Sequence, residues 1–222
     1  MTRKILVVAP HPDDETLGCG GALLRHRADG DAVHWVIVTA MSPATHSAAR
    51  REQRAAEVRE VARLYGFAST QELGFPSAGL ESVPRAELVE KMSAAFQAVR
   101  PDVAYLPHPG DSHGDHRAAF EAAASCAKWF REPTLRRVLT YETLSETDAA
   151  LDPTEQPFRP TVFVDITAQL ERKLEILGRY DGEIGEFPFP RSLEAVRALA
   201  RVRGVASGCA AAEAFQLLKE TL

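Results

Sequence analysis

The chain has 222 residues, of which 45% are hydrophobic and 26% are charged, and its formal net charge is −5. This length and composition fit one α/β domain covering residues 1–222, and the negative charge argues against general nucleic-acid binding. The cysteines, Cys19, Cys126 and Cys209, form no CxxC pair, which argues against a disulfide framework or a cysteine-built zinc site. Because no signal peptide or long apolar stretch is evident, we expect a cytoplasmic protein without a membrane span.

Short β-rich runs alternate with helical patterns along the chain. Strands are predicted at Lys4–Ala9, Val33–Thr39, Gln71–Gly74, Val103–Leu106, Val138–Tyr141 and Thr161–Val164. Helices are predicted at Gly20–Ala28, Ser47–Tyr65, Arg85–Val99, His116–Phe130, Thr167–Tyr180 and Ser192–Arg203. An irregular loop is expected at Leu144–Arg159, and Ala210–Lys219 fits either a helix or a strand. This alternation indicates an α/β fold: a single-domain, Rossmann-like three-layer sandwich with a mostly parallel sheet and helices on both faces.

The segment "KILVVAPHPDDETLGCGG", Lys4–Gly21, places one imidazole and three carboxylates directly after an apolar strand. The strand shows no alternation of polar residues, as expected when both faces of a sheet are covered. Carboxylates at such a position lose hydration and repel one another, and a bound cation would remove both difficulties. The simpler alternative is that Asp13, Asp14 and Thr16 cap the following helix.

A second polar loop, "PHPGDSHGDH" at Pro107–His116, follows the fourth predicted strand. In doubly wound sheets the first and fourth strands are often neighbours, and ligands bind at their carboxyl ends. The two loops are therefore expected to meet, although the second could also be a polar loop with nothing bound. His11, Asp14 and His116 would then supply two imidazoles and a carboxylate, which is typical of catalytic zinc sites. Asp13 and His113 would lie beside them, where a general base and a general acid are needed.

The motif "PHPDDE", followed later by "HGDH", resembles the LmbE/PIG-L family of metal-dependent N-deacetylases. Members act on N-acetylglucosamine-type sugars linked to inositol, malic acid, lipids, antibiotics or nucleotides. The resemblance covers nearly the whole chain and implies that His11, Asp14 and His116 bind the metal. It also implies that Asp13 activates water, and that His113 protonates the amine or steadies the tetrahedral intermediate.

Further roles follow from the same resemblance. Asp115 would orient His113 or form a charge pair with it, and Arg54 of "RAAE" would reach the substrate. Two positions depart from the family pattern. Gly114 stands where the family usually has proline. Asp111 occupies a position on the substrate side where some members have an oxyanion-donating tyrosine, so the oxyanion role is unassigned.

Other substrate contacts are expected around these motifs. His46 precedes the second helix and is a weaker candidate. The segment "GEIGEFPFPRS", Gly182–Ser192, together with "YETLSET", resembles a branch of the family associated with surface-polysaccharide and modified-sugar biosynthesis. In that branch Glu142 and Arg191 would contact the substrate, and the alternative for both is loop packing and ion pairing. "GCGGA", Gly18–Ala22, lacks the spacing of a dinucleotide motif and is expected to let the first helix pack closely.

The sequence thus predicts a zinc-dependent hydrolase that removes the N-acetyl group from an N-acetylglucosamine-type sugar or its conjugate. Ferrous iron or another divalent metal fits the same ligands. The partner would be a small N-acetylated molecule, and assembly into a homo-oligomer is left open. Two alternatives stand beside this prediction: a metal-dependent amidase of a non-sugar substrate, and a Rossmann-like nucleotide-binding protein without hydrolytic activity.

Overall fold

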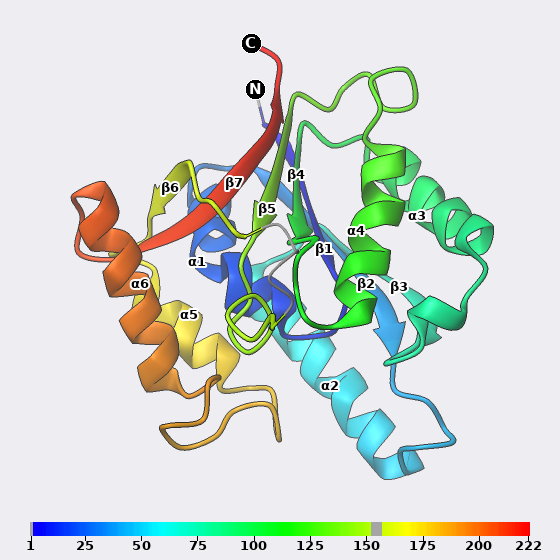
Figure 1. The fold of residues 1–222 in the computed structure, drawn as a ribbon, viewed down its shortest axis with the longest axis horizontal. Helices are drawn as coiled ribbons and strands as arrows, with labels where there is room; N and C mark the ends of the chain where they lie inside the picture. The colour runs from blue at the N-terminus through cyan, green and yellow to red at the C-terminus, as the bar shows by residue number, and fades with distance from the viewer. Residues whose placement is uncertain (1, 152–156) are drawn as a thin grey trace.

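A seven-stranded sheet forms the centre of the molecule (Figure 1). The computed structural model describes residues 2–151 and 157–222. The strands are β1 (Lys4–Ala9), β2 (Ala32–Ala40), β3 (Ser69–Pro76), β4 (Val103–Pro107), β5 (Arg137–Tyr141), β6 (Val162–Asp165) and β7 (Ala212–Glu220). Their order is β3-β2-β1-β4-β5-β7-β6. Strands β1 to β5 pair in parallel, whereas β7 is antiparallel to both β5 and β6.

Helices cover both faces of this sheet. They are α1 (Asp14–Ala28), α2 (Ala48–Tyr65), α3 (Arg85–Val99), α4 (Gly114–Cys126), α5 (Leu170–Leu177), α6 (Leu193–Ser207) and the short 3₁₀ helix η1 (Leu80–Ser82). Ile5 and Val7 of β1 pack into a core with α1, α2, α5 and α6, while Leu6 and Val8 pack with α3 and α4 on the other face. Since side chains alternate across a strand, an unbroken apolar β1 serves both layers. The predicted three-layer α/β sandwich is confirmed.

The boundaries of several elements differ from those predicted. Helix α1 begins at Asp14, ahead of the predicted Gly20, and has a non-helical backbone at Cys19. Helix α4 ends at Cys126, so the predicted end at Phe130 is wrong, and that side chain is exposed. The ambiguous segment near the C-terminus is strand β7. In the expected loop, residues 144–151 and 157–159 contain no helix or strand, and residues 152–156 lie outside the described part of the chain.

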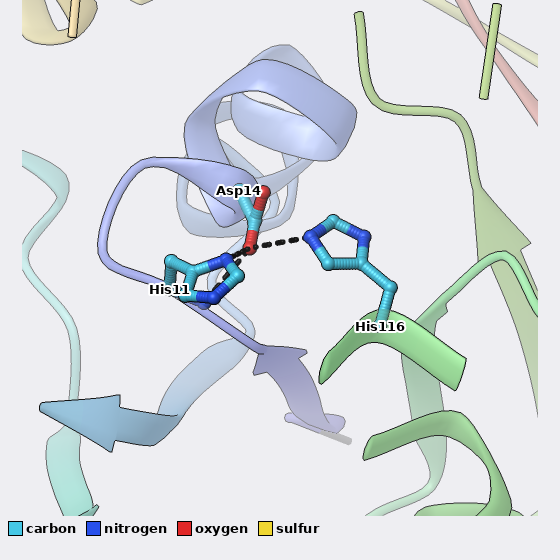
Figure 2. A group of neighbouring side chains, drawn as sticks. All are labelled: His11, Asp14 and His116. Atoms are coloured by element: carbon cyan, nitrogen blue, oxygen red, sulfur yellow. Dashed lines mark hydrogen bonds and ion pairs between the residues drawn. The ribbon is translucent and has the colours of Figure 1, made fainter. Parts of the chain in front are cut away.

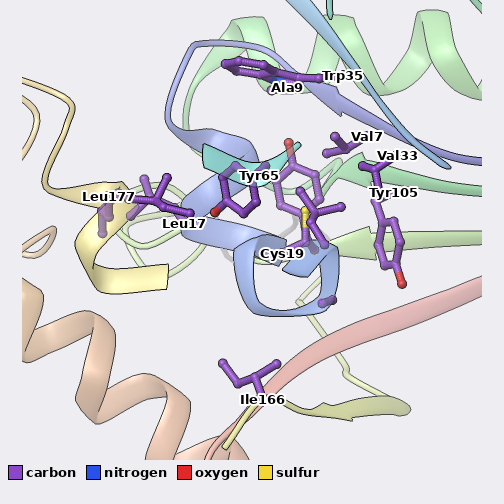
Figure 3. Close-up of a cluster of buried hydrophobic side chains, with 14 of the residues drawn as sticks. Val7, Ala9, Leu17, Cys19, Val33, Trp35, Tyr65, Tyr105, Ile166 and Leu177 are labelled. Carbon is purple, nitrogen blue, oxygen red and sulfur yellow. The ribbon is translucent and has the colours of Figure 1, made fainter. Parts of the chain in front are cut away.

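The glycines of α1 allow the helix to lie directly on its neighbours. A Cβ atom at Gly18 would come within 2.1 Å of the Tyr141 ring, and one at Gly21 within 2.6 Å of Ile166. The Tyr141 hydroxyl in turn donates a hydrogen bond to the carbonyl of Val8, at 2.8 Å. Figure 3 shows the apolar cluster that surrounds this helix. The predicted close packing is confirmed, and it fixes the first turn of α1 at the carboxyl end of β1.

The three cysteines are free thiols. The cytoplasmic location expected from the sequence stays a prediction. Among the helices of the described residues, each is too short or too polar to span a lipid bilayer.

Candidate metal centre and active site

The loops after β1 and β4 meet at one edge of the sheet. β1 lies between β2 and β4, so the chain moves to one side after β1 and returns to the other side with β4. The carboxyl ends of strands at such a switch point form the usual ligand crevice of open α/β sheets. Potential ligand atoms of His11, Asp14 and His116 all lie within 4.8 Å of one another there. The predicted meeting of the two loops is confirmed.

Asp14 lies at the centre of this group (Figure 2). Its Oδ2 atom is 3.3 Å from Nδ1 of His11 and 3.3 Å from Nε2 of His116. The same oxygen accepts a hydrogen bond from the backbone N–H of His11, at 2.8 Å, which closes the turn between them. Asp14 and His116 are buried, and His11 is only partly exposed. The group therefore has the compactness that a single cation requires.

Carboxylates hold the outer nitrogen of each imidazole. Asp111 Oδ2 is 2.7 Å from Nδ1 of His116, and Asp115 Oδ2 is 2.9 Å from Nε2 of His11. Carboxylates placed behind metal-binding histidines fix the ring orientation and raise its basicity. Because Asp111 is buried and its other oxygen accepts from the Thr147 hydroxyl at 2.6 Å, the expectation that it faces the substrate is wrong.

Asp115 contacts His113 differently from what was expected. Its backbone N–H donates to Nδ1 of His113 at 3.1 Å, so it does orient this ring. Its carboxylate, however, lies against His11 and accepts hydrogen bonds from the backbone N–H groups of Ala78 and Leu80, at 2.7 and 3.0 Å. Because Nδ1 of His113 accepts the Asp115 N–H, His113 is the N-cap residue of α4. Its other ring nitrogen, Nε2, is the one that can act on a ligand.

The donor set of His11, Asp14 and His116 fits a divalent cation. Burial alone would raise the pKa of Asp14, but the two neighbouring histidines hold it well below the usual range. Burial opposes protonation of His11, yet hydrogen bonds to Asp115 and Asp14 raise the pKa of this imidazole to about 9. A cation at this position would balance Asp14 in place of those imidazole protons. His11, His113 and Asp115 form a second compact group, but both oxygens of Asp115 already accept hydrogen bonds.

Asp13 and His113 lie beside this centre, Asp13 close to other carboxylates and His113 close to another imidazole. Burial raises the pKa of Asp13 well above its usual value, Asp14 and Glu183 raise it further, and Arg191 opposes them. Arg191 Nη1 is 3.1 Å from Oδ2 of Asp13. Burial and the proximity of His11 lower the pKa of His113. Shifted acids and bases of this kind are common at catalytic sites.

A cavity of about 410 Å³ opens in front of these side chains. It is lined by residues from the loops after β1 and β4, from β2 and the loop after it, from α2, from β3 and the residue after it, from the segment after β5 and from the segment before α6. These residues are His11, Pro12, Asp13, Asp14, Thr39, Ala40, Met41, His46, Arg51, Arg54, Ala55, Val58, Glu72, Ser77, His113, Thr143, Glu146, Glu183 and Arg191. The expected substrate contacts His46, Arg54 and Arg191 are among them. Glu142 is not: it pairs with Arg203 at 2.8 and 2.5 Å, so the ion-pair alternative describes its place in the structure.

Glu183 and Glu15 were not predicted as part of the site. Glu183 contacts Arg54 and Arg191, and the only sequence signal for it was its place in a loop rich in charge, glycine and proline. Glu15 belongs to the first motif but points away from the cavity, where it accepts hydrogen bonds from Tyr180 and Thr16. Its role is to support the turn rather than to contact a ligand.

A parallel α/β sandwich with a histidine–aspartate cluster at its switch point defines a class of metal-site enzymes. Within this class, the chain belongs to the family described as PIG-L: GlcNAc-PI de-N-acetylase, which matches residues 6–127. The resemblance drawn from the two motifs is therefore confirmed, and with it the assignment of the chain to the de-N-acetylase class of enzymes.

Comparison with individual proteins agrees with this membership. The chain is 26% identical to a diacetylchitobiose deacetylase from Thermococcus kodakarensis, over 97% of this chain and 83% of that protein. It is 31% identical to a 1D-myo-inositol 2-acetamido-2-deoxy-alpha-D-glucopyranoside deacetylase from Saccharomonospora viridis, over 65% of this chain and 64% of that protein. The crystal structure of the conserved protein TT1542 from Thermus thermophilus superposes with a TM-score of 0.78 at 31% identity, covering 100% of this chain and 97% of that one.

Proposed function

We propose that this protein is a zinc-dependent hydrolase that removes the N-acetyl group from an N-acetylglucosamine-type amino sugar or its conjugate. The observation that carries the proposal is the convergence of His11, Asp14 and His116 beside a cavity that Asp13 and His113 line. The names of the two curated relatives support the substrate class, since both deacetylate N-acetylated glucosamine derivatives.

His11, Asp14 and His116 are the residues that would hold the metal. Two imidazoles and one carboxylate are the ligands of many catalytic zinc sites, and ferrous iron also accepts them. When bound, such a cation supplies Lewis acidity toward an acyl oxygen and lowers the pKa of water. The hydrogen bonds that the outer ring nitrogens donate to Asp111 and Asp115 keep both rings turned toward the same point.

Asp13 is the proposed general base. Its carboxylate takes a proton from the attacking water, whose oxygen forms the new bond to the acetyl carbon. Arg191, 3.1 Å away, provides a positive charge that favours the ionised carboxylate despite its burial. A general base must lie within reach of the reacting atom, and Asp13 lines the cavity next to the proposed ligand Asp14.

His113 is the proposed general acid. Because its Nδ1 atom accepts the backbone N–H of Asp115, its proton is carried on Nε2. The nitrogen of the scissile amide is a poor leaving group, and a proton from Nε2 lets it depart as a free amine when the C–N bond breaks. The donor is the imidazolium form, in which a second proton on Nδ1 replaces the hydrogen bond from the Asp115 N–H, and the lowered pKa of His113, caused by burial and by His11, makes this form a stronger acid. The products are acetate and the amino sugar.

The cavity suits a sugar-sized ligand. Its volume of about 410 Å³ lies in the range of small-molecule sites. Its lining also includes His46, Arg51, Glu72 and Glu146, whose charged and polar groups can hydrogen-bond hydroxyl groups. Cytoplasmic location and a homo-oligomeric state remain predictions.

The two alternatives differ in how well they fit this arrangement. A metal-dependent amidase of a non-sugar substrate would use the same residues, so only the substrate separates it from the proposal. A nucleotide-binding protein fits less well. The buried carboxylates of Asp13 and Asp14 stand at the start of α1, where a pyrophosphate would have to lie.

The test is acetate release with zinc-loaded protein from N-acetylglucosamine, its nucleotide conjugate, diacetylchitobiose and inositol- or lipid-linked forms. We expect Asp13→Ala to abolish turnover while metal stays bound, and His116→Ala to lose both. Asp29→Ala, an exposed carboxylate at the other end of α1, serves as the control and should behave as wild type. Retained turnover in Asp13→Ala would refute the assignment of the base. Stoichiometric metal without acetate from any acetylated sugar would favour the amidase.

A further inference from the structure

Glu183 connects two arginines at the wall of the cavity. It lies in the segment between α5 and α6. Its Oε1 atom pairs with Nη2 of Arg54 from α2, and its Oε2 atom lies 3.4 Å from Nη1 of Arg191. Each carboxylate oxygen thus serves a different guanidinium group, so the carboxylate is a bridge between them.

Both arginines also contact the turn that follows β1. Nη1 of Arg54 donates to the backbone carbonyl of Pro12 at 3.1 Å, and Nη1 of Arg191 lies 3.1 Å from the Asp13 carboxylate. Arg54 is buried, with a side-chain exposure of 7%, while Arg191 and Glu183 are partly exposed at 26% and 24%. All three side chains line the cavity, with Arg54 the most buried of them, and the two guanidinium groups contact two consecutive residues of the turn.

This turn needs support from outside because Asp13 has a strained backbone. Its φ is 129° and its ψ is −28°, a conformation that residues with a Cβ atom rarely adopt. Strain at a functional position persists only where the surroundings determine the conformation. The local contribution is a small set of hydrogen bonds: the Asp13 N–H donates to Oε2 of Glu15 at 3.1 Å, and the Asp13 carbonyl accepts from the N–H groups of Thr16 and Leu17 at 2.9 and 2.8 Å. The contacts from Arg54 and Arg191 come from distant segments and add to it.

We propose that Glu183 is a positioning residue: by bridging Arg54 and Arg191 it holds the strained turn at Pro12 and Asp13 and aims the Asp13 carboxylate at the cavity. The expected effect on catalysis rests on the proposed function, but the expected effect on the conformation of the turn does not. In this arrangement the segment between α5 and α6 is part of the catalytic apparatus, although the proposal gives Glu183 no contact with the reacting atoms.

The experiment compares Glu183→Gln with Glu186→Gln in the zinc-loaded enzyme. Glu186 lies in the same segment, is exposed and has no side-chain partner among the described contacts, so its substitution makes the same change in charge without touching the bridge. For Glu183→Gln we expect kcat to fall about 10- to 100-fold with KM within about twofold, as for a displaced catalytic group. Hydrogen exchange of a peptide covering residues 10–17 should become faster in this variant and remain unchanged in the control.

Arg191→Gln provides a second variant should Glu183→Gln fold poorly. If Glu183 acts through Arg191, the double variant Glu183→Gln/Arg191→Gln should have a kcat little lower than that of Arg191→Gln alone. A double variant whose loss of kcat equals the product of the two single losses would overturn the proposal. Glu183→Gln could instead speed hydrogen exchange only within residues 178–192 and leave kcat unchanged. Glu183 would then stabilise only its own loop, and the proposal would be overturned. A wild-type protein that releases no acetate would refute the proposed function only, because the exchange of residues 10–17 still decides the positioning role.

Discussion

Asp111 and His116 form a buried pair in which Oδ2 of the carboxylate lies 2.7 Å from Nδ1 of the imidazole. The opposite ring nitrogen, Nε2, lies 3.3 Å from Asp14. This pair decides which nitrogen of His116 faces the proposed metal, since the nitrogen next to the carboxylate carries the proton. Asp111, which the sequence placed on the substrate side, therefore supports a proposed metal ligand.

We predict that Asp111→Asn weakens zinc binding by about 10- to 100-fold, the usual effect of losing a carboxylate behind a metal-binding histidine. The asparagine keeps the shape of the side chain but loses the negative charge that increases the basicity of His116. Competition with a chelating dye measures the affinity. The control is Ser112→Ala, because the Ser112 hydroxyl donates to the partly exposed Glu146 carboxylate and does not contact the histidine–aspartate pair. Equal zinc affinities for wild type and Asp111→Asn would show that the pair does not support the ligand.

Metal removal should lower thermal stability. The three proposed ligands bring a buried carboxylate and two imidazoles together, and a cation that binds only the folded state adds stability by mass action. At a free zinc concentration about 100 times the Kd this amounts to about 2.7 kcal/mol, or roughly 5–10 °C for a domain of this size. Calorimetry with zinc and with a chelator measures the shift. His116→Ala should show a much smaller shift, and an equal shift in that variant would place the stabilising metal elsewhere.

The sheet and the core of the site could be predicted because each rests on local signals. The apolar run Ile5–Val8 identified a strand covered on both faces, and the parallel topology then required the loops after the first and fourth strands to meet. Helix and strand patterns do not show which part of the site a long loop, such as the segment between α5 and α6, contacts. The contact of Arg191 with Asp13 joins residues 178 positions apart and could not be read from spacing.

Boundaries failed where tertiary contacts override local propensity. Glycines at positions 18, 20 and 21 favour a late start for α1, yet buried contacts to Tyr141 and Ile166 stabilise a helix that begins at Asp14 and is interrupted at Cys19. Lys173 and Glu213 support this interruption, because Lys173 Nζ donates to the Leu17 carbonyl and Glu213 accepts from backbone N–H groups of the second half of the helix. Such long-range capping leaves no local sequence signal.

We predict that Gly18→Ala destabilises the protein by about 1–3 kcal/mol or more, the typical cost of inserting a methyl group into a packed interior. The added Cβ would lie 2.1 Å from the Tyr141 ring, and both the ring and the helix are buried. Urea denaturation measures the loss. Gly178→Ala is the control, because its nearest neighbours would be at 3.5 Å and its φ of −64° suits alanine. A change of less than about 0.5 kcal/mol at Gly18 would contradict the close packing.

Glu15 gives the fold a pH dependence whose sign can be worked out. Burial raises the pKa of this carboxyl to about 7 from an ordinary value of 4.5, against the opposing hydrogen bonds from Thr16 and Tyr180. Between these two values the folded protein keeps the proton more firmly than the unfolded chain does. The contribution of Glu15 to stability is therefore complete below about pH 4.5 and is lost as the pH rises through about 7.

Glu15→Gln removes this titration while keeping an oxygen that can accept the Tyr180 hydroxyl, now at 2.6 Å from Oε1. The substitution carries a cost of its own, since the amide NH₂ faces the Asp13 N–H, but that cost does not change with pH. We expect the free energy of unfolding of the metal-free wild type, minus that of Glu15→Gln, to decrease steadily from pH 4.5 to 7 in urea denaturation. The subtraction cancels the contributions of Asp13 and of the other titratable groups that the two proteins share. Parallel stability curves across this range would mean that the folded protein holds Glu15 no more firmly protonated than the unfolded chain does.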